Sequence, residues 1–257
     1  MTAVSRVRSE AVAAWHSFLR RRVAVFFTFF FPVLLVGIFG ALVQTNPAGG
    51  GLFAEDPAYY VPAYLAVVVL QTPLSRMGAE VARHREGSRF EKLATTPLSR
   101  AEWLAAHTLV NTAIIGIAGV VLLGLTVALT GADVTYSPLI LAYVLLGVAT
   151  FCGVGSMLGA LSDSQDGAVT AANAVGLPLL FLSETFVPPS MLPDWFHPIV
   201  ALSPLTYFAQ GLRQVMWAGS ETGTVVLGLD GIQSLAVLGV LAVLFFGLGA
   251  KVIPQTD

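Results

Sequence analysis

The chain has 257 residues, of which 56% are apolar and only 11% are Asp, Glu, Lys or Arg. Ordinary soluble domains carry about 25% charged residues, so a soluble fold of this size would lack the polar side chains to cover its surface. A formal net charge of −2 and only two lysines leave no basic face for nucleic acid. These numbers exclude a soluble enzyme, a disordered chain and a nucleic-acid-binding protein. The single cysteine excludes an internal disulfide.

Six apolar stretches are long enough to cross a bilayer, which takes about 20 residues per helix. They cover roughly 23–43, 58–78, 108–130, 138–160, 168–187 and 231–250. The second is the weakest because Pro62, Gln71 and Pro73 interrupt it. Neighbouring helices can satisfy the carbonyls that proline frees, so we expect a kinked helix that faces other helices. The sequence predicts an all-α membrane protein with six transmembrane helices, forming a single domain over residues 1–257.

The basic residues indicate the orientation. Twelve of the thirteen lysines and arginines lie before the first stretch, from the end of the second to the third, or after the sixth. Because cytoplasmic loops carry an excess of Lys and Arg, both termini are expected in the cytoplasm. Only Arg213 falls on the outer side, where the segments carry acidic residues. The expected location is the cell (plasma) membrane, with a multi-pass topology.

Residues 1–22 contain a predicted amphipathic helix. Its apolar positions follow helical spacing, and arginines occupy the other faces. The apolar set is Val4, Val7, Ala11, Ala14, Trp15 and Phe18. Such a helix is expected to lie in the inner membrane interface, with Trp15 at the level of the headgroups. The alternative is a plain charged tail.

The cytoplasmic segment 79–104 is too elaborate for a simple connector. Gly87 can end the helix that continues from the second span. Ser88–Glu91 and Ser99–Glu102 each fit a capping box, and Thr96-Pro97 would stop the first of the two helices. The pattern predicts a short, separately capped helix between two membrane helices.

This short helix would expose Phe90 and Leu93 among charges, one turn apart. An apolar pair on a rigid helix suits a groove in another protein. The alternative is a solvated loop whose Phe90 dips back into the headgroups.

The outer segment 188–220 is apolar but too short and interrupted to span. Ser203 is a plausible N-cap with Pro204 at the first helical position. The helix that follows carries one apolar stripe, made of Leu205, Phe208, Ala209, Leu212 and Met216. A re-entrant or interfacial helix is expected, and Trp195, Phe196, Tyr207 and Trp217 would form an outer aromatic belt. Arg213 could pair with a lipid phosphate or with Glu184, or extend to water.

The chain carries no motif for catalysis. It contains no G-x-x-x-x-G-K-[ST], no H-E-x-x-H and no G-x-S-x-G, and its four histidines are scattered. We therefore expect no catalytic residue, no metal site and no ATP hydrolysis by this chain. Glu184, near the outer end of the fifth stretch, could line a substrate path, pair with Arg213 or simply reach water.

Two segments resemble the ABC-2 permeases, the membrane subunits of ATP-binding-cassette exporters. Residues 85–97 are similar to that family's E-x-G-[TS]-x-E-x-L-x-x-T-P loop, and residues 186–188, 192–195, 202–207 and 212–213 look like its outer signature. The resemblance covers nearly the whole chain and extends to the length, the six spans and the cytoplasmic termini. Glu184 departs from the small or neutral residue that relatives often carry.

The resemblance implies roles for these residues. A coupling helix at 88–95 would dock on a separate ABC ATPase subunit, which would bind ATP and Mg, while this chain would bind no cofactor. The residues assigned to this coupling are Arg85, Glu86, Gly87, Ser88, Phe90, Glu91, Leu93, Thr96 and Pro97. Those assigned to the substrate path or outer gate are Glu184, Phe186, Pro204, Tyr207 and Arg213. A second permease chain is expected across the path, with a homodimer favoured over a heterodimer.

The function expected from the resemblance is ATP-driven export of a hydrophobic or amphipathic substrate. A drug, a lipid and a lipid-linked glycan all stay open. The alternatives are a secondary transporter, which would need internal repeats and midplane charges, or a non-catalytic membrane anchor.

Overall fold

The computed structural model describes residues 2–38, 57–183, 185, 193–217 and 228–253. These residues form helices and connecting segments, and no strand occurs among them. The helices are α1 (Ala3–Arg20), α2 (Arg22–Val36), α3 (Pro57–Glu86), α4 (Arg89–Ala94), α5 (Arg100–Thr130), α6 (Leu139–Leu161), α7 (Gln165–Leu182), the 3-10 turn η3 (Asp194–Phe196), α8 (His197–Val200), α9 (Pro204–Met216) and α10 (Gly231–Val252). The all-helical class expected from the sequence is confirmed for this part of the chain.

Local capping explains several helix ends. Ser99 accepts a hydrogen bond from the backbone N–H of Glu102, whose side chain reaches back to the N–H of Ser99, so the capping box predicted at the start of α5 is present. Asp230 and Gln233 form a second such box at the start of α10. Gly131 ends α5 with a φ of 66°, a left-handed backbone that glycine adopts without steric cost.

The weakest of the predicted spans forms the centre of the fold. Every side chain from Ala58 to Leu70 of α3 is buried, and α3 continues through Pro62 and Pro73 without a break. It packs against α5, α6, α7 and α9. The predicted contact with other helices is therefore confirmed, and it explains why α3 can carry prolines and Gln71.

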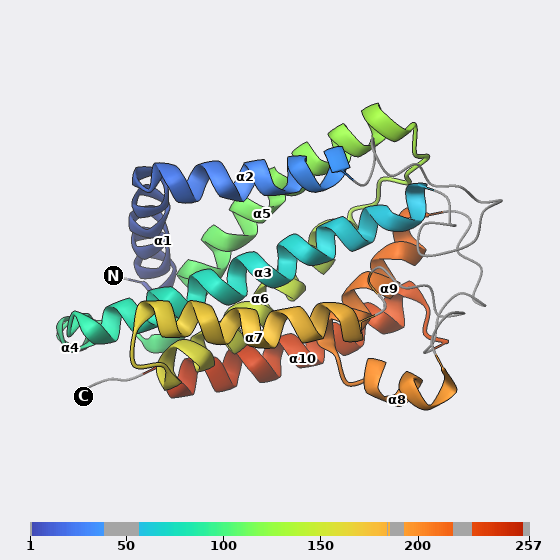
Figure 1. Ribbon diagram of the computed structural model, residues 1–257. Helices are drawn as coiled ribbons and strands as arrows, with labels where there is room; N and C mark the ends of the chain where they lie inside the picture. The colour runs from blue at the N-terminus through green and yellow to red at the C-terminus, as the bar shows by residue number, and fades with distance from the viewer. Residues whose placement is uncertain (1, 39–56, 184, 186–192, 218–227, 254–257) are drawn as a thin grey trace.

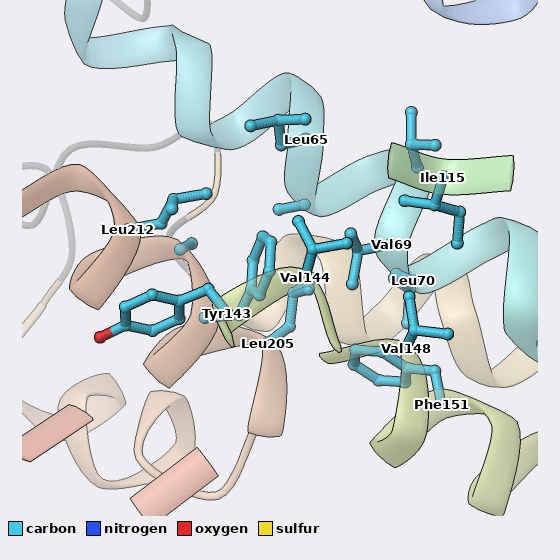
Figure 2. Close-up of a cluster of buried hydrophobic side chains, with 14 of the residues drawn as sticks. Leu65, Val69, Leu70, Ile115, Tyr143, Val144, Val148, Phe151, Leu205 and Leu212 are labelled. Atoms are coloured by element: carbon cyan, nitrogen blue, oxygen red, sulfur yellow. The ribbon is translucent and has the colours of Figure 1, made fainter. Parts of the chain in front are cut away.

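The largest buried cluster joins α3, α5, α6 and α9 (Figure 2). Leu65 and Val69 of α3 lie beside the α6 side chains, and Leu205 and Leu212 approach from α9. Tyr143 of α6 has its hydroxyl bonded to the carbonyl of Gly231, which ties α6 to the start of α10. Helices far apart in the sequence are thereby held as one bundle.

Helix α6 approaches α3 through a G-x-x-x-G face. A Cβ at Gly155 would lie 2.6 Å from the carbonyl oxygen of Leu74, and a Cβ at Gly159 would overlap the carbonyl oxygen of Gly78. Only glycine allows the two backbones to come this close. This spacing is thus a packing contact in the fold.

Three of the described helices, α5, α6 and α10, are long and apolar enough to cross a membrane. Each exposes large apolar side chains, including Val120 at 72%, Leu141 at 70% and Val243 at 76%. A bilayer can surround such an apolar exterior without the free-energy cost of exposing it to water. The remaining predicted spans overlap α2, α3 and α7, and residues 39–43 of the first lie outside the described chain.

The bundle has two distinct ends (Figure 1). Helices α1 and α4 and the C-terminal end of α10 lie at one, here called the α4 end, and α8 and α9 lie toward the other, the α9 end. Helix α1 turns across the α4 end, and its Phe18 is buried against Val110 and Ile114 of α5. The predicted helix is present, but the C-terminal half of its apolar stripe faces protein.

Candidate functional site

The predicted short helix is present as α4, although it begins differently from the expectation. Ser88 adopts a left-handed backbone with φ 46° and ψ 37°, and its side chain makes no capping hydrogen bond. A capping serine needs extended backbone, so the capping box predicted for Ser88–Glu91 is wrong. The backbone N–H groups of Gly87 and Ser88 instead donate to the carbonyls of Arg83 and Arg85. Ser88, not Gly87, supplies the positive φ that reverses the chain between α3 and α4.

Phe90 does not project from α4 as predicted. It is 7% exposed, and its ring lies 5.3 Å from that of Trp103 and 5.2 Å from that of His84, measured between centroids. Trp103 in turn lies 4.3 Å from His107. This aromatic ladder, defined as Phe90, His84, Trp103 and His107, joins α4 to the ends of α3 and α5. Phe90 therefore anchors α4 and cannot itself enter a partner's groove.

The surface that α4 and the turn after it leave exposed is small and contains both polar and apolar side chains. Leu93 is partly buried, and Glu91, Thr96 and Pro97 are exposed. Beside them lies a hollow of about 450 Å³, lined by residues of α4, by the 96–99 turn, by the start of α5 and by Ile253. The hydroxyls of Thr95 and Thr96 donate to carbonyls at the end of α4, which closes the helix where the Thr96-Pro97 pair predicts.

Arg85 and Glu86, the first two residues of the motif, bind within the chain. One guanidinium nitrogen of Arg85 donates to the carbonyls of Ala160, at 2.6 Å, and Ser162, at 3.0 Å. Glu86 accepts from the backbone N–H of Gln165 at 2.8 Å. A carboxylate at a helix N-terminus is favourable, so the pair fastens the segment before α4 to the turn between α6 and α7.

Helix α1 is attached to the start of α5 by an ion pair. Arg6 forms a two-pronged contact with Glu102, with one nitrogen–oxygen distance of 3.2 Å. Hydrogen bonds from Arg6 and from the backbone N–H of Ser99 lower the pKa of Glu102 to about 2. Glu102 thus serves the capping box and the attachment of α1 together.

A second charged group lies deeper at the same end, around Glu80. Its carboxylate contacts Arg83, lies 3.4 Å from His84 and lies 3.6 Å from Arg21. Burial would raise the pKa of Glu80, but the charges of His107, Arg83 and His84 outweigh that effect and lower it. Burial lowers the pKa of His84, whose ring packs against those of Phe90 and Trp103.

At the other end, α9 confirms the predicted apolar stripe, all five members of which are buried. Ser203 and Pro204 occupy the predicted N-cap and first helical positions, but the Ser203 side chain makes no capping hydrogen bond. The hydroxyl of Tyr207 donates to the carbonyl of Ala201 at 2.8 Å, which holds α9 against the end of α8. Trp195, one of the four residues of the predicted belt, is 70% exposed.

Arg213 is 2% exposed, so it does not extend to water. Its guanidinium lies 4.0 Å above the Tyr59 ring, and its Nε lies 3.4 Å from the Tyr59 carbonyl. The arginine therefore attaches α9 to the start of α3. Glu184 and Phe186, the two other gate residues expected from the sequence, lie outside the described residues.

Sequence reasoning missed the groups that hold α4 in place. The sequence pattern assigns no role to Trp103, His84 or His107. The one available signal was helical spacing, because His84 lies four residues after Glu80 and His107 four after Trp103. That spacing gives neighbours along one helix but not the contact between helices.

These features define an α-helical membrane protein. At one end, the short helix α4 is anchored to the bundle beside a hollow, and at the other end lies the buried amphipathic helix α9. The family model for the ABC-2 type transporter matches residues 8–217, and the chain belongs to that family.

Two relatives agree with this assignment. The chain is 27% identical over 220 residues to the "Daunorubicin resistance ABC transporter permease protein DrrB1" of Streptomyces coeruleorubidus, covering 81% of this chain and 77% of that protein. It is 25% identical over 197 residues to the "Putative transport permease ycf38" of Porphyra purpurea, covering 72% of this chain and 64% of that protein. The chain is thus a transport permease of the ABC class.

Proposed function

We propose that this chain is the permease subunit of an ATP-driven exporter and that the α4 end receives a separate ABC ATPase subunit. The observation that supports this most directly is α4 itself, a six-residue helix anchored by Phe90 and by the bonds of Arg85 and Glu86, yet open beside a hollow of about 450 Å³. A segment that transmits the movement of a partner to the bundle must be rigidly attached to the bundle. The sequence lacks an ATP-binding P-loop, so ATP and Mg would belong to the partner.

The proposed contact surface is Glu91, Leu93, Thr96 and Pro97, together with the exposed backbone at Gly87 and Ser88. Arg85, Glu86 and Phe90 act in this proposal as positioning residues that hold the surface in place. The similarity to a permease named for daunorubicin resistance favours a hydrophobic or amphipathic substrate. Pro204, Tyr207 and Arg213, with Glu184 and Phe186, are proposed for the outer gate.

The proposal includes the topology. The six apolar stretches of the sequence support six spans in a single transmembrane domain. The distribution of basic residues supports placing both termini and the α4 end in the cytoplasm. A second permease chain, in a homodimer, would complete the path across the cell membrane. The exposed apolar sides of α5 and α10 provide surface both for lipid and for that second chain.

The test is a pull-down of the tagged chain from its native membrane in mild detergent, with mass spectrometry of the bound proteins. We expect a stoichiometric ATPase with a P-loop. Leu93→Asp should abolish its capture, because a carboxylate would have to be buried against the partner. Leu161→Asp is the matched control, since Leu161 is 77% exposed at the same end of the bundle and lies outside the proposed surface.

Capture of the ATPase by Leu93→Asp at the wild-type level would contradict the coupling surface. Recovery of the wild-type chain without any ATPase, at several salt concentrations, would contradict the exporter itself. A secondary transporter or an anchor would then replace it.

A further inference from the structure

A small polar pocket lies at the α4 end, apart from the surface proposed for the ATPase. It has a volume of about 180 Å³ and lies where α1 meets α2, α3, α5 and α7. A water molecule takes up about 30 Å³ of liquid, so the pocket has room for a much larger group. Its polar lining consists of Ser17, Arg21, Ser75, Arg76, Glu80, His107 and Asn111.

Arg76 is the unexplained group in this lining. Among the residues that the structure describes, it has no ion-pair partner, and its Nη1 is shielded from solvent and without a hydrogen bond. Its guanidinium stacks on the Phe18 ring, 4.3 Å from the centroid. Stacking covers a face of the guanidinium and leaves its N–H edge for an anion, with the geometry that suits a phosphate.

The nearby acids are already occupied. Glu80 is in contact with Arg83 and lies within 3.6 Å of Arg21, and Glu10 lies 3.4 Å from His107. Two acids therefore face three arginines, and the surplus positive charge falls on Arg76.

The surroundings of the pocket indicate which kind of molecule would bear such an anion. Ala24 of α2 forms part of the wall of the pocket. Around it, α2 exposes large apolar side chains: Val23 is 71% exposed, Phe26 56% and Phe27 57%. Acyl chains can lie along such an apolar surface while a phosphate reaches the pocket at the membrane interface.

We propose that this pocket binds the phosphate of an anionic phospholipid, with Arg76 as its main ligand and Arg21, Ser17 and Ser75 around it. The lipid would fix α1 against α3 and α5. If both termini face the cytoplasm, as proposed above, this lipid lies in the inner leaflet. The binding of the lipid does not depend on that orientation.

The experiment uses the full chain in phosphatidylcholine nanodiscs, with or without phosphatidylglycerol. Retained lipid is measured by native mass spectrometry, and the unfolding temperature is measured in parallel. We expect the wild-type chain to retain phosphatidylglycerol and to unfold at a higher temperature when it is present. Arg76→Gln should weaken that binding by about tenfold, the effect of losing a charge-assisted hydrogen bond. Arg20→Gln, at an exposed arginine outside the pocket, should leave it unchanged.

A second variant keeps the test decisive if Arg76→Gln fails to fold. Ser17→Asp places a carboxylate in the pocket, so it should abolish the preference for phosphatidylglycerol while the protein stays as stable in pure phosphatidylcholine as the wild type. Undiminished lipid binding in Ser17→Asp, or equal losses in Arg76→Gln and Arg20→Gln, would overturn the proposal.

Equal thermal protection by inorganic phosphate in pure phosphatidylcholine would identify a soluble phosphate ligand and overturn the lipid assignment. No ATPase is present in these assays. A negative result therefore leaves the proposed export function untouched.

Discussion

At the scale of single residues, Glu102 joins local folding to the docking of α1. It completes the capping box of α5 and holds Arg6. Its pKa is lowered to about 2 by Arg6 and by the N–H of Ser99. A carboxylate whose pKa is lowered by folding contributes stability that is complete above its unfolded pKa, about 4.3, and is lost as the pH falls toward the folded value.

We therefore expect α1 to stay docked under mildly acidic conditions. The distance between spin labels at Val4 on α1 and Leu109 on α5, both exposed, should be constant from neutral pH to about pH 4 and should lengthen toward about pH 2. Glu102→Gln is the control, and its label distance should be broad at every pH. A lengthening in the wild-type chain between about pH 6 and 5 would instead indicate a histidine as the controlling group.

The residue scale also shows what a local motif can predict. Ser88 and Ser99 both begin an S-x-x-E pattern, yet only Ser99 forms the box. Ser99 follows a proline-containing turn that leaves it extended, with φ −79° and ψ 159°. Ser88 comes two residues after the end of α3 and must reverse the chain. The S-x-x-E motif supplies the side chains for the two capping hydrogen bonds. The conformation of the preceding backbone determines whether these bonds form.

At the scale of elements, the packing of α6 on α3 depends on the absence of side chains. Adding a Cβ at Gly159 would force it onto the carbonyl of Gly78. Gly159→Ala should therefore cost about 1–3 kcal/mol, because the two backbones must separate. A chain of this size would lose several degrees in unfolding temperature, at about 2–4 °C per kcal/mol.

Gly124→Ala in α5 is the matched control for this change. A Cβ there meets nothing within 4 Å, and alanine favours helix over glycine by about 1 kcal/mol. Thermal unfolding of both variants in detergent should give opposite signs, with Gly159→Ala destabilised and Gly124→Ala unchanged or stabilised. Equal destabilisation would show that the α3–α6 contact does not set the stability of the bundle.

Elements were predicted better than the contacts between them. The ranges 108–130, 138–160 and 231–250 fall within or nearly match α5, α6 and α10, because long apolar runs specify helices without tertiary help. Phe90 was misplaced because its burial depends on Trp103, which lies in the next helix. The contact of Arg213 with Tyr59 was missed for the same reason, since Tyr59 lies far away in the sequence. Contacts of this kind require the fold to be known.

At the scale of the whole molecule, the proposed coupling surface is connected to α1 by an unbroken series of contacts. Phe90 of α4 touches Trp103, Trp103 touches His107, and His107 lies 3.4 Å from Glu10 of α1. Movement of α4 by a bound ATPase would therefore reach α1 through the large Trp103 ring. Trp103→Leu removes the middle of this series while leaving the exposed side of α4 intact.

In the complex with the proposed ATPase, ATP should change the hydrogen exchange of the α1 amides in the wild-type chain. Trp103→Leu should keep the ATPase bound but reduce this ATP-dependent change at least tenfold, because the smaller side chain cannot contact Phe90 and His107 together. Trp195→Leu makes the same substitution at a tryptophan that is 70% exposed and should respond as the wild type does. An undiminished response in Trp103→Leu would mean that movement reaches α1 by another route, such as the Arg6–Glu102 pair at the start of α5.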